Sequence, residues 1–362
     1  MIRQHARWWR SALSLLVITS GTGCETLWGG FSVPNQGYCS LPDCSDDAGV
    51  GPQADADAAM APMDLSLTGD LAGLDLGVVG PTIVAVGTKG TILRRIYGVW
   101  RLDASLTTSD LVRVHGSDAK HIFAVGKAGT IVGFDGGLWK TQSAGKLQDL
   151  SSIYVRSATE AWASGAGGTL LSWNGQLWAS LTAPTTGQIV SIVGGPAPLP
   201  LRGLTNLGNG SNELLSSVDG TAWAITAGAG LPAGTYMKLW GSSTSSLWAV
   251  GWNSHLAQWN GSAWTSHASP VPASFGGVWG FGLSNVWVVG SGGVVLRYTG
   301  PGGGWTKIAV PSTANLLDIY GTSLNDIWVV GEGGTILHFD GLKWQQVPSP
   351  TLDSLWGVWA GF

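Results

Sequence analysis

The stretch "DIWVVGEGGTILHFDGLKW", residues 326–344, decides the fold because the chain repeats it along most of its length. Related versions begin at residue 121 with "HIFAVGKAGTIVGFDGGLW", at residue 160 with "EAWASGAGGTLLSWNGQLW" and at residue 246 with "SLWAVGWNSHLAQWNGSAW". Self-similarity at a fixed period is typical of a repeat architecture, in which one unit cannot bury its apolar faces alone.

The period of the repeat identifies the architecture. The glycines that end the first apolar run of each unit lie 39 to 45 residues apart, at Gly87, Gly126, Gly165, Gly210, Gly251, Gly290 and Gly331. A Trp follows most of these glycines at a fixed spacing, at Trp100, Trp139, Trp178, Trp223, Trp264, Trp305 and Trp344. Seven units with a period near 40 residues predict an all-β fold, a seven-bladed β-propeller.

Each unit is predicted to contain four short strands. In the last unit these are "LLDIYG", "DIWVV", "TILHF" and "KWQQV", within residues 316–347. Gly-rich turns join strands two and three, and Asp-Gly or Asn-Gly pairs join strands three and four, because both tolerate the positive φ of tight turns. Strand two is apolar at consecutive positions, which indicates a sheet that is covered on both faces, as blades of a propeller are.

The two ends of the repeat region are predicted to meet. The first unit starts with strand two, at "TIVAVG", and the tail "DSLWGVW" matches the strand-one text "FGGVWG" at residues 275–280. A C-terminal inner strand would therefore complete the first blade and close the propeller, which removes an exposed sheet edge.

The units resemble the bacterial Asp-box (BNR-like) propellers and the related photosystem II assembly-factor type, over about residues 81–362. The Asp-box pattern has Ser or Thr two residues before Asp, one residue between Asp and Gly, and then Trp. Here Gly follows Asp directly, as at Asp340 and Gly341, and only Ser217 before Asp219 keeps the hydroxyl. The resemblance implies a seven-bladed all-β fold, and the glycosidase activity of some Asp-box proteins does not carry over with a fold.

Residues 1–23 are predicted to be a signal peptide, because three Arg precede the short apolar run "ALSLLVI" and small residues follow it. "GTGC" at residues 21–24 resembles the lipobox of bacterial lipoproteins, although Gly21 stands where that family usually has Leu. The resemblance implies cleavage before Cys24 and lipidation of its sulfur. An ordinary signal peptide with a chance Cys is the alternative.

Residues 24–80 are predicted to be a disordered acidic linker. Residues 25–80 carry nine acidic side chains and no Lys or Arg, a composition that buries too little apolar surface to fold. The linker would tether the propeller, residues 81–362, to a membrane. Three Cys in an exported chain leave an odd one, so Cys39 and Cys44 are predicted to form a disulfide once Cys24 carries lipid.

The sequence predicts no catalytic residue, metal ligand set or cofactor. Basic and acidic groups are nearly balanced in residues 81–362, so no electrostatic footprint for nucleic acid is present. His115 stands where other units have aromatic residues and is predicted to fill an inner strand. Most Trp are predicted to be core, namely the seven that follow the hairpins and Trp162, Trp248, Trp287 and Trp328.

Residues that break the repeat are the candidate ligand contacts. Trp252 and Asn253 lie in a turn between strands two and three, His255 follows that turn, and Tyr236 belongs to the connection into the same unit. With strand one innermost, these four residues are predicted to share the rim opposite the Asp-Gly hairpins. The alternative is a drifted turn whose Trp only covers its neighbour.

The predicted function is non-enzymatic binding or scaffolding at a Gram-negative envelope. The protein would be exported, monomeric and held by the lipid on Cys24 at the outer membrane or cell surface, with the periplasmic side as an alternative location. Its partner would be an envelope glycan or a surface protein, and not a nucleic acid. The alternatives are a glycan-active hydrolase or lyase of Asp-box type, and an assembly factor for a surface complex such as a pilus or secretion machine.

Overall fold

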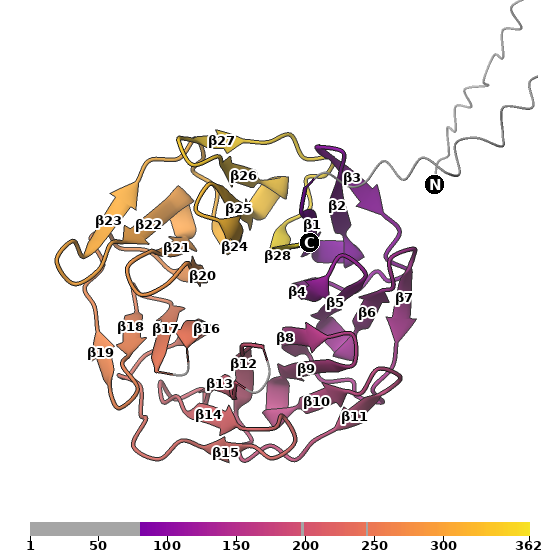
Figure 1. Cartoon of the computed structure of the whole chain (residues 1–362), viewed down its shortest axis with the longest axis horizontal. Helices are drawn as coiled ribbons and strands as arrows, with labels where there is room; N and C mark the ends of the chain where they lie inside the picture. Colours follow the sequence, from indigo (N-terminus) through magenta and orange to yellow (C-terminus); the bar gives the residue numbers. More distant parts are fainter. Residues whose placement is uncertain (1–79, 197–198, 244) are drawn as a thin grey trace, which may run out of the picture. The chain divides into compact units, whose positions relative to one another are not determined.

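The computed structural model describes residues 80–196, 199–243 and 245–362, which form seven four-stranded antiparallel sheets arranged in a ring (Figure 1). The predicted seven-bladed β-propeller is confirmed. The predicted signal peptide at 1–23 and, except for its last residue, the linker at 24–80 lie outside the described residues, as do Cys24, Cys39 and Cys44. No helix within the described residues is long and apolar enough to cross a membrane.

In each blade the first strand is innermost and the fourth is outermost (Figure 1). From the inside outward, the strands of blades 1 to 4 are β28 (Leu355–Gly361), β1 (Thr82–Gly87), β2 (Ile92–Ile96) and β3 (Val99–Asp103); β4 (Leu111–Asp118), β5 (His121–Gly126), β6 (Ile131–Phe134) and β7 (Trp139–Gln142); β8 (Leu150–Ser157), β9 (Glu160–Gly165), β10 (Leu170–Trp173) and β11 (Trp178–Ser180); β12 (Gln188–Val193), β13 (Leu201–Asn206), β14 (Leu214–Ser217) and β15 (Ala224–Ile225). Those of blades 5 to 7 are β16 (Tyr236–Ser243), β17 (Ser246–Gly251), β18 (Leu256–Trp259) and β19 (Trp264–Ser266); β20 (Phe275–Gly280), β21 (Val286–Gly290), β22 (Val294–Tyr298) and β23 (Trp305–Ile308); β24 (Leu316–Ser323), β25 (Asp326–Gly331), β26 (Ile336–Phe339) and β27 (Trp344–Gln346).

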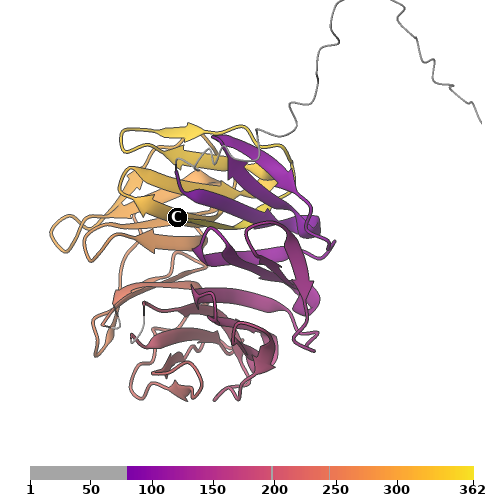
Figure 2. The ribbon, with the colours of Figure 1, turned by 45° about the vertical axis from the view of Figure 1, so that its right-hand side comes forward.

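The C-terminal strand closes the propeller as predicted. β28 pairs antiparallel with β1, with Val84 opposite Trp359 and Gly87 opposite Leu355. The side chain of Trp359 packs with residues of blades 1 and 2, so the last strand joins the core of the first two blades. Figure 1 shows β28 and the C-terminus at the inner edge of the first blade, and Figure 2 shows the same ring of sheets from another side.

The turns have the conformations that their sequences predict. Gly341 has φ +90°, and the backbone N–H groups of Leu342 and Lys343 donate to Oδ1 of Asp340 at 2.9 and 2.8 Å. The same Asx-Gly arrangement recurs in other blades, which explains why Gly directly follows Asp in this repeat. On the other rim, short 3-10 turns join strands two and three, as at Glu332–Gly334.

Blade 4 differs from the predicted alignment. Gly210 does not end its second strand; the backbone N–H of Thr205 donates to the carbonyl of Glu213, the bond that Gly165 makes to Thr169 in blade 3. Thr205 is therefore the equivalent residue, and the turn after it is four residues longer than in the other blades. The prediction for Gly210 is wrong because the glycines of this longer turn resemble the Gly that ends strand two in the other blades.

The core lies between the blades. Ile327, Trp328, Val329 and Val330 of β25 are all at most 1% exposed, because blades cover both faces of the sheet. The prediction that the recurrent Trp are core is confirmed for nine of eleven, which are at most 8% exposed. The other two, Trp264 and Trp305, are partly buried and pack against core clusters.

Candidate functional site

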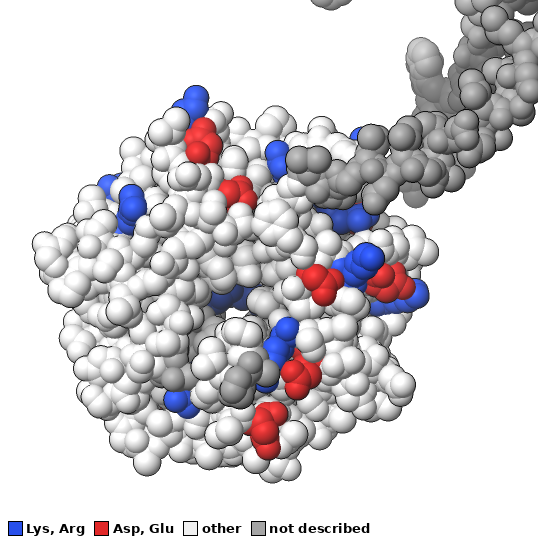
Figure 3. Space-filling view, in the orientation of Figure 1, with Lys and Arg blue, Asp and Glu red and all other residues white. Residues whose placement is uncertain are grey.

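A cavity of about 530 Å³ lies on the propeller axis and is called the mouth cavity. Its walls come from the beginnings of all seven inner strands and from turns between strands two and three. The mouth cavity therefore opens on the rim predicted for the ligand, here called the turn rim; the opposite rim is the hairpin rim. Figure 3 shows that the centre of the ring is hollowed, with Lys or Arg atoms bordering the hollow.

Large apolar side chains form much of the mouth cavity. Trp252 is 52% exposed and Trp356, near the start of β28, is 38% exposed. Met237, Leu317 and Phe275 of three other inner strands also line it. Exposed aromatic and Met side chains are enriched where proteins bind other proteins, since they offer large apolar area that adapts to a partner.

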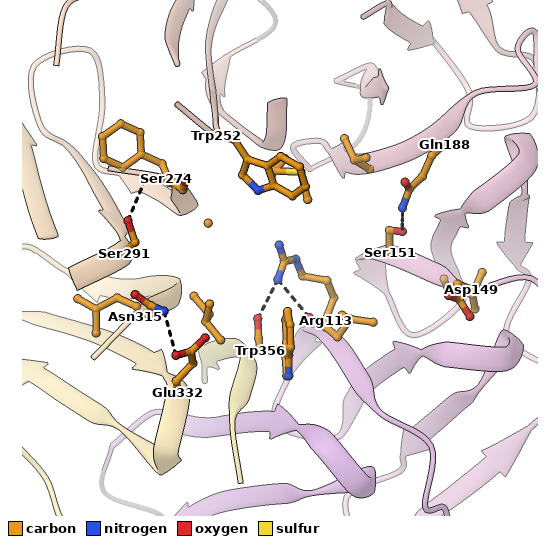
Figure 4. Close-up of a pocket in the computed structure, with 18 of the residues that line it drawn as sticks. Arg113, Asp149, Ser151, Gln188, Trp252, Ser274, Ser291, Asn315, Glu332 and Trp356 are labelled. Atoms are coloured by element: carbon orange, nitrogen blue, oxygen red, sulfur yellow. Dashed lines mark hydrogen bonds between the residues drawn. The ribbon is translucent and has the colours of Figure 1, made fainter. Parts of the chain in front are cut away.

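Most polar side chains at the mouth cavity already have partners. The first pair is Lys127 Nζ to Asp149 Oδ2 at 2.8 Å. The second and third, which Figure 4 shows, are Asn315 Nδ2 to Glu332 Oε2 at 2.9 Å and Gln188 Nε2 to Ser151 Oγ at 2.7 Å. Hydrogen bonds from Lys127 and from the backbone N–H of Ala128 lower the pKa of Asp149. The first and third pairs connect neighbouring blades, the second lies within blade 7, and together they leave few polar atoms free for a ligand.

Arg113 is the exception, and it extends into the centre of the cavity (Figure 4). Its Nη1 donates to the carbonyl oxygens of Val112 at 3.1 Å and of Trp356 at 2.8 Å. The bond to Trp356 joins β28 of blade 1 to β4 of blade 2. Nε and Nη2 have no partner among the described residues, so part of the guanidinium remains available to a ligand.

The turn that carries Trp252 is distinct in backbone geometry as well as in sequence. Asn253 and Ser254 have φ of +50° and +65°, although neither is Gly. The other short turns place Gly at the second of these two positions. Consecutive left-handed non-glycine residues store conformational strain, which is concentrated at functional sites. The Ser254 Oγ accepts from the backbone N–H of Ala273 at 3.0 Å, and this bond helps hold the turn.

The structure places the four predicted contacts at different depths. Trp252 and Asn253 are exposed at the turn rim, and His255 is partly buried. Tyr236 begins β16 instead of lying in the connection before it, and at 1% exposure its phenol is in the core between blades 4 and 5. Its ring lies 5.5 Å from the His255 ring, so Tyr236 supports the turn from below.

The sequence analysis did not predict the charged residues that the inner strands place around the propeller axis. Arg113, Lys238 and Asp318 occupy the same position of β4, β16 and β24, since each pairs with the residue before the Gly that ends strand two. Comparing inner strands position by position shows these charges in a column otherwise filled by Ser and Gly. Within residues 80–196, 199–243 and 245–362, no group of three His, Cys, Asp or Glu is placed to hold a metal ion.

The ring of sheets and its axial mouth place the chain in the class of seven-bladed β-propellers. No protein-family model and no curated protein matches the sequence. Among solved structures, the chain is similar to "YCF48 bound to D1 peptide", with 18% identity and a TM-score of 0.55 over 73% of this chain and 84% of that one. It is also similar to YCF48 from Cyanidioschyzon merolae, with 17% identity and a TM-score of 0.53 over 67% and 87% of the two chains. The WD40 propeller domain of Doa1 gives 12% identity and a TM-score of 0.57 over 76% and 90%.

These identities establish a shared fold and nothing more specific. The fold expected from the resemblance to the photosystem II assembly-factor type is thereby confirmed. The binding roles of Trp252, Asn253, His255 and Tyr236 stay predictions.

Proposed function

We propose that the protein is a non-enzymatic binding propeller that takes an extended segment of a protein partner into its mouth cavity. The observation that carries the proposal is the exposed Trp252 on a strained turn, facing an axial cavity with Trp356 on its wall. At about 530 Å³ the cavity falls within the usual range of about 300–1,000 Å³ for ligand pockets. One of the structurally similar propellers, YCF48, is described as bound to a peptide, which supports a peptide ligand here.

The chemistry of the walls favours a peptide over a glycan. A sugar needs many hydrogen bonds, and most polar groups of the mouth cavity are already bonded to one another. Apolar side chains of a peptide would instead cover Trp252, Trp356 and Met237 and gain about 25 cal/mol for each Å² removed from water.

The carboxylates also favour binding over glycoside hydrolysis. A glycosidase acid needs a raised pKa, so that it is protonated when the leaving group departs. The pKa of Asp149 is lowered by its bonds to Lys127 and Ala128. Glu332 accepts a hydrogen bond from Asn315, which uses one of its oxygens.

Selection of peptides from a random display library tests the proposal. Selected peptides should bind at least tenfold more weakly to the Trp252→Ala variant, because a hot-spot aromatic contributes about 2 kcal/mol or more. Leu342→Ala is the matched control, since Leu342 is 92% exposed on the hairpin rim. Equal binding by both variants, or a loss of folding in Trp252→Ala, would refute the role of Trp252. Selective binding on a glycan array with no peptide selected would favour the glycan alternative.

We further propose that the propeller is exported and anchored at the envelope through lipid on Cys24. The support is the order of basic, apolar and small residues before that Cys and the acidic composition of residues 25–80. The anchor would hold the mouth cavity close to partners of the same membrane. An assembly role for a surface complex is one form that such binding can take.

A further inference from the structure

A second cavity, of about 260 Å³, lies deeper on the axis and is called the axial chamber. Inner strands of all seven blades line it, and Arg113 is the one described residue that it shares with the mouth cavity. Its volume is slightly below the lower end, about 300 Å³, of the usual range for drug-sized ligands. The axial chamber therefore suits a molecule with a single ring.

Five side chains form a continuous arc of rings along the wall, here called the aromatic belt: Tyr154, His115, Tyr320, Trp279 and Trp240. Successive ring centroids in this order lie 5.0, 6.3, 3.9 and 6.2 Å apart. Such a belt offers flat apolar surface against which a planar ligand packs. Nε1 of Trp279 is buried and has no hydrogen-bond partner among the described residues.

The charges of the axial chamber are unbalanced. Lys238 Nζ donates to Asp318 Oδ1 at 2.9 Å, and the backbone N–H of Val358 donates to Asp318 Oδ2 at 3.2 Å. Both oxygens of this carboxylate are therefore engaged. Arg113 adds a second cation, and among the described lining residues no second carboxylate opposes it. Burial, followed by the charge of Arg113, lowers the pKa of Lys238 to about 8.

His115 adds a neutral donor to the chamber wall. Its Nδ1 accepts from the backbone N–H of Val155 at 3.1 Å, so the ring proton lies on Nε2. Burial lowers the pKa of His115 to about 3, and the ring is neutral at pH 7. With two cations and one carboxylate among its described lining residues, the chamber favours an anion that accepts hydrogen bonds.

We propose that the axial chamber binds a small organic carboxylate with a flat apolar body. The carboxylate lies between Arg113 and Lys238, and the ring packs against the aromatic belt. A guanidinium suits this role because it donates parallel hydrogen bonds to a carboxylate. The proposed ligand is a free acid. The C-terminal carboxylate of a peptide inserted from the mouth cavity is the other source of the same chemistry.

Calorimetric titration with 3-phenylpropanoate tests the proposal, with the neutral 3-phenylpropanamide as the matched ligand. We expect the acid to bind at least tenfold more tightly than the amide. Arg113→Gln should weaken binding of the acid at least tenfold. Arg101→Gln changes an exposed residue of the outermost strand β3 and should leave the affinity for the acid unchanged. Absence of binding, equal binding of acid and amide, or an unchanged affinity in Arg113→Gln would overturn the proposal.

A proton-uptake measurement keeps the proposal testable if Arg113→Gln does not fold. An anion beside Lys238 raises its pKa, so binding at pH 8 should take up as much as about half a proton, and binding at pH 6.5 almost none. The other titratable groups on the wall are Arg113, His115, Tyr154, Asp318 and Tyr320. Binding of the acid at pH 8 without proton uptake would place the carboxylate away from Lys238.

Two further measurements distinguish a free acid from a peptide C-terminus, and distinguish binding in the axial chamber from binding in the mouth cavity. A tripeptide that ends in Phe is compared with its C-terminal amide; if the tripeptide acid binds and 3-phenylpropanoate does not, the free-acid proposal is wrong. Trp252 does not line the axial chamber, so Trp252→Ala should leave binding of 3-phenylpropanoate unchanged. Failure of the peptide-binding proposal and failure of this one are therefore distinguishable.

Discussion

Replacing Trp359 by Ala should remove a large part of the stability of the propeller, because that side chain joins the C-terminal strand to the first two blades. Trp359 is 2% exposed and packs in a cluster with Val84, Leu111 and Phe134. Truncating a buried Trp to Ala typically costs about 3–5 kcal/mol, against total stabilities of about 5–15 kcal/mol. Trp356→Ala is the matched control three residues earlier in the same strand, since Trp356 is 38% exposed and its loss should cost about 1 kcal/mol or less.

Urea unfolding followed by far-ultraviolet circular dichroism measures both variants. We expect the midpoint for Trp359→Ala to fall by about 1 M or more, from slopes of about 1–3 kcal/mol/M, and the midpoint for Trp356→Ala to change little. Deleting residues 352–362 removes the whole inner strand of blade 1, so the truncated protein should aggregate or melt far earlier. Equal midpoints for the two Trp variants, or a full melting temperature after the deletion, would refute closure by β28.

Three further predictions concern other parts of the chain. The pKa of His115 falls from 6.5 to about 3 on folding, so the unfolded state binds more protons between these two pH values and the protein loses stability as the pH falls. From pH 7 to pH 5 the free energy of unfolding should decrease by about 2 kcal/mol. Denaturant titrations at the two pH values should show that His115→Asn removes most of this decrease. A Cβ on Gly220, at φ +80°, would lie 2.1 Å from the Trp162 indole, whereas Gly228 has φ +70° and open space around it. Gly220→Ala should therefore lower the free energy of unfolding by about 1–3 kcal/mol more than Gly228→Ala. Similar melting temperatures of the two variants would contradict this packing. Mass spectrometry of the mature N-terminal peptide should find acyl chains on Cys24, and an unmodified Cys24 or cleavage elsewhere would leave an exported protein without this anchor.

The blades and their closure were predictable because their signals are local. An apolar run, a Gly-rich turn and an Asx-Gly hairpin fall within about twenty residues of each other, and the final strand matches the text of other inner strands. Blade 4 was misaligned because Thr205 replaces the usual Gly while Gly210 lies in an enlarged turn. The sequence around Gly210 therefore resembles the end of a second strand more closely than the sequence around Thr205 does.

The site was predicted only in part because its residues meet through ring closure. Trp252 was identified by its break with the repeat, and it does line the mouth cavity. Tyr236 was placed on the rim, although the equivalent residues of other inner strands, such as Leu111 and Phe275, are apolar and buried. Arg113 and Asp318 are far apart in sequence, and only the closed propeller brings them to one chamber.

Hydrogen–deuterium exchange of the protein with and without a display-selected peptide tests the central claim most directly. We expect slower exchange on the turn rim, in the segment around Trp252 and at the start of β28, with no change at the Asx-Gly hairpins. The Trp252→Ala variant should lose this protection at the same peptide concentration. Protection confined to the hairpin rim, or protection of the turn rim that survives in Trp252→Ala, would contradict recognition of a peptide through Trp252 at the mouth cavity.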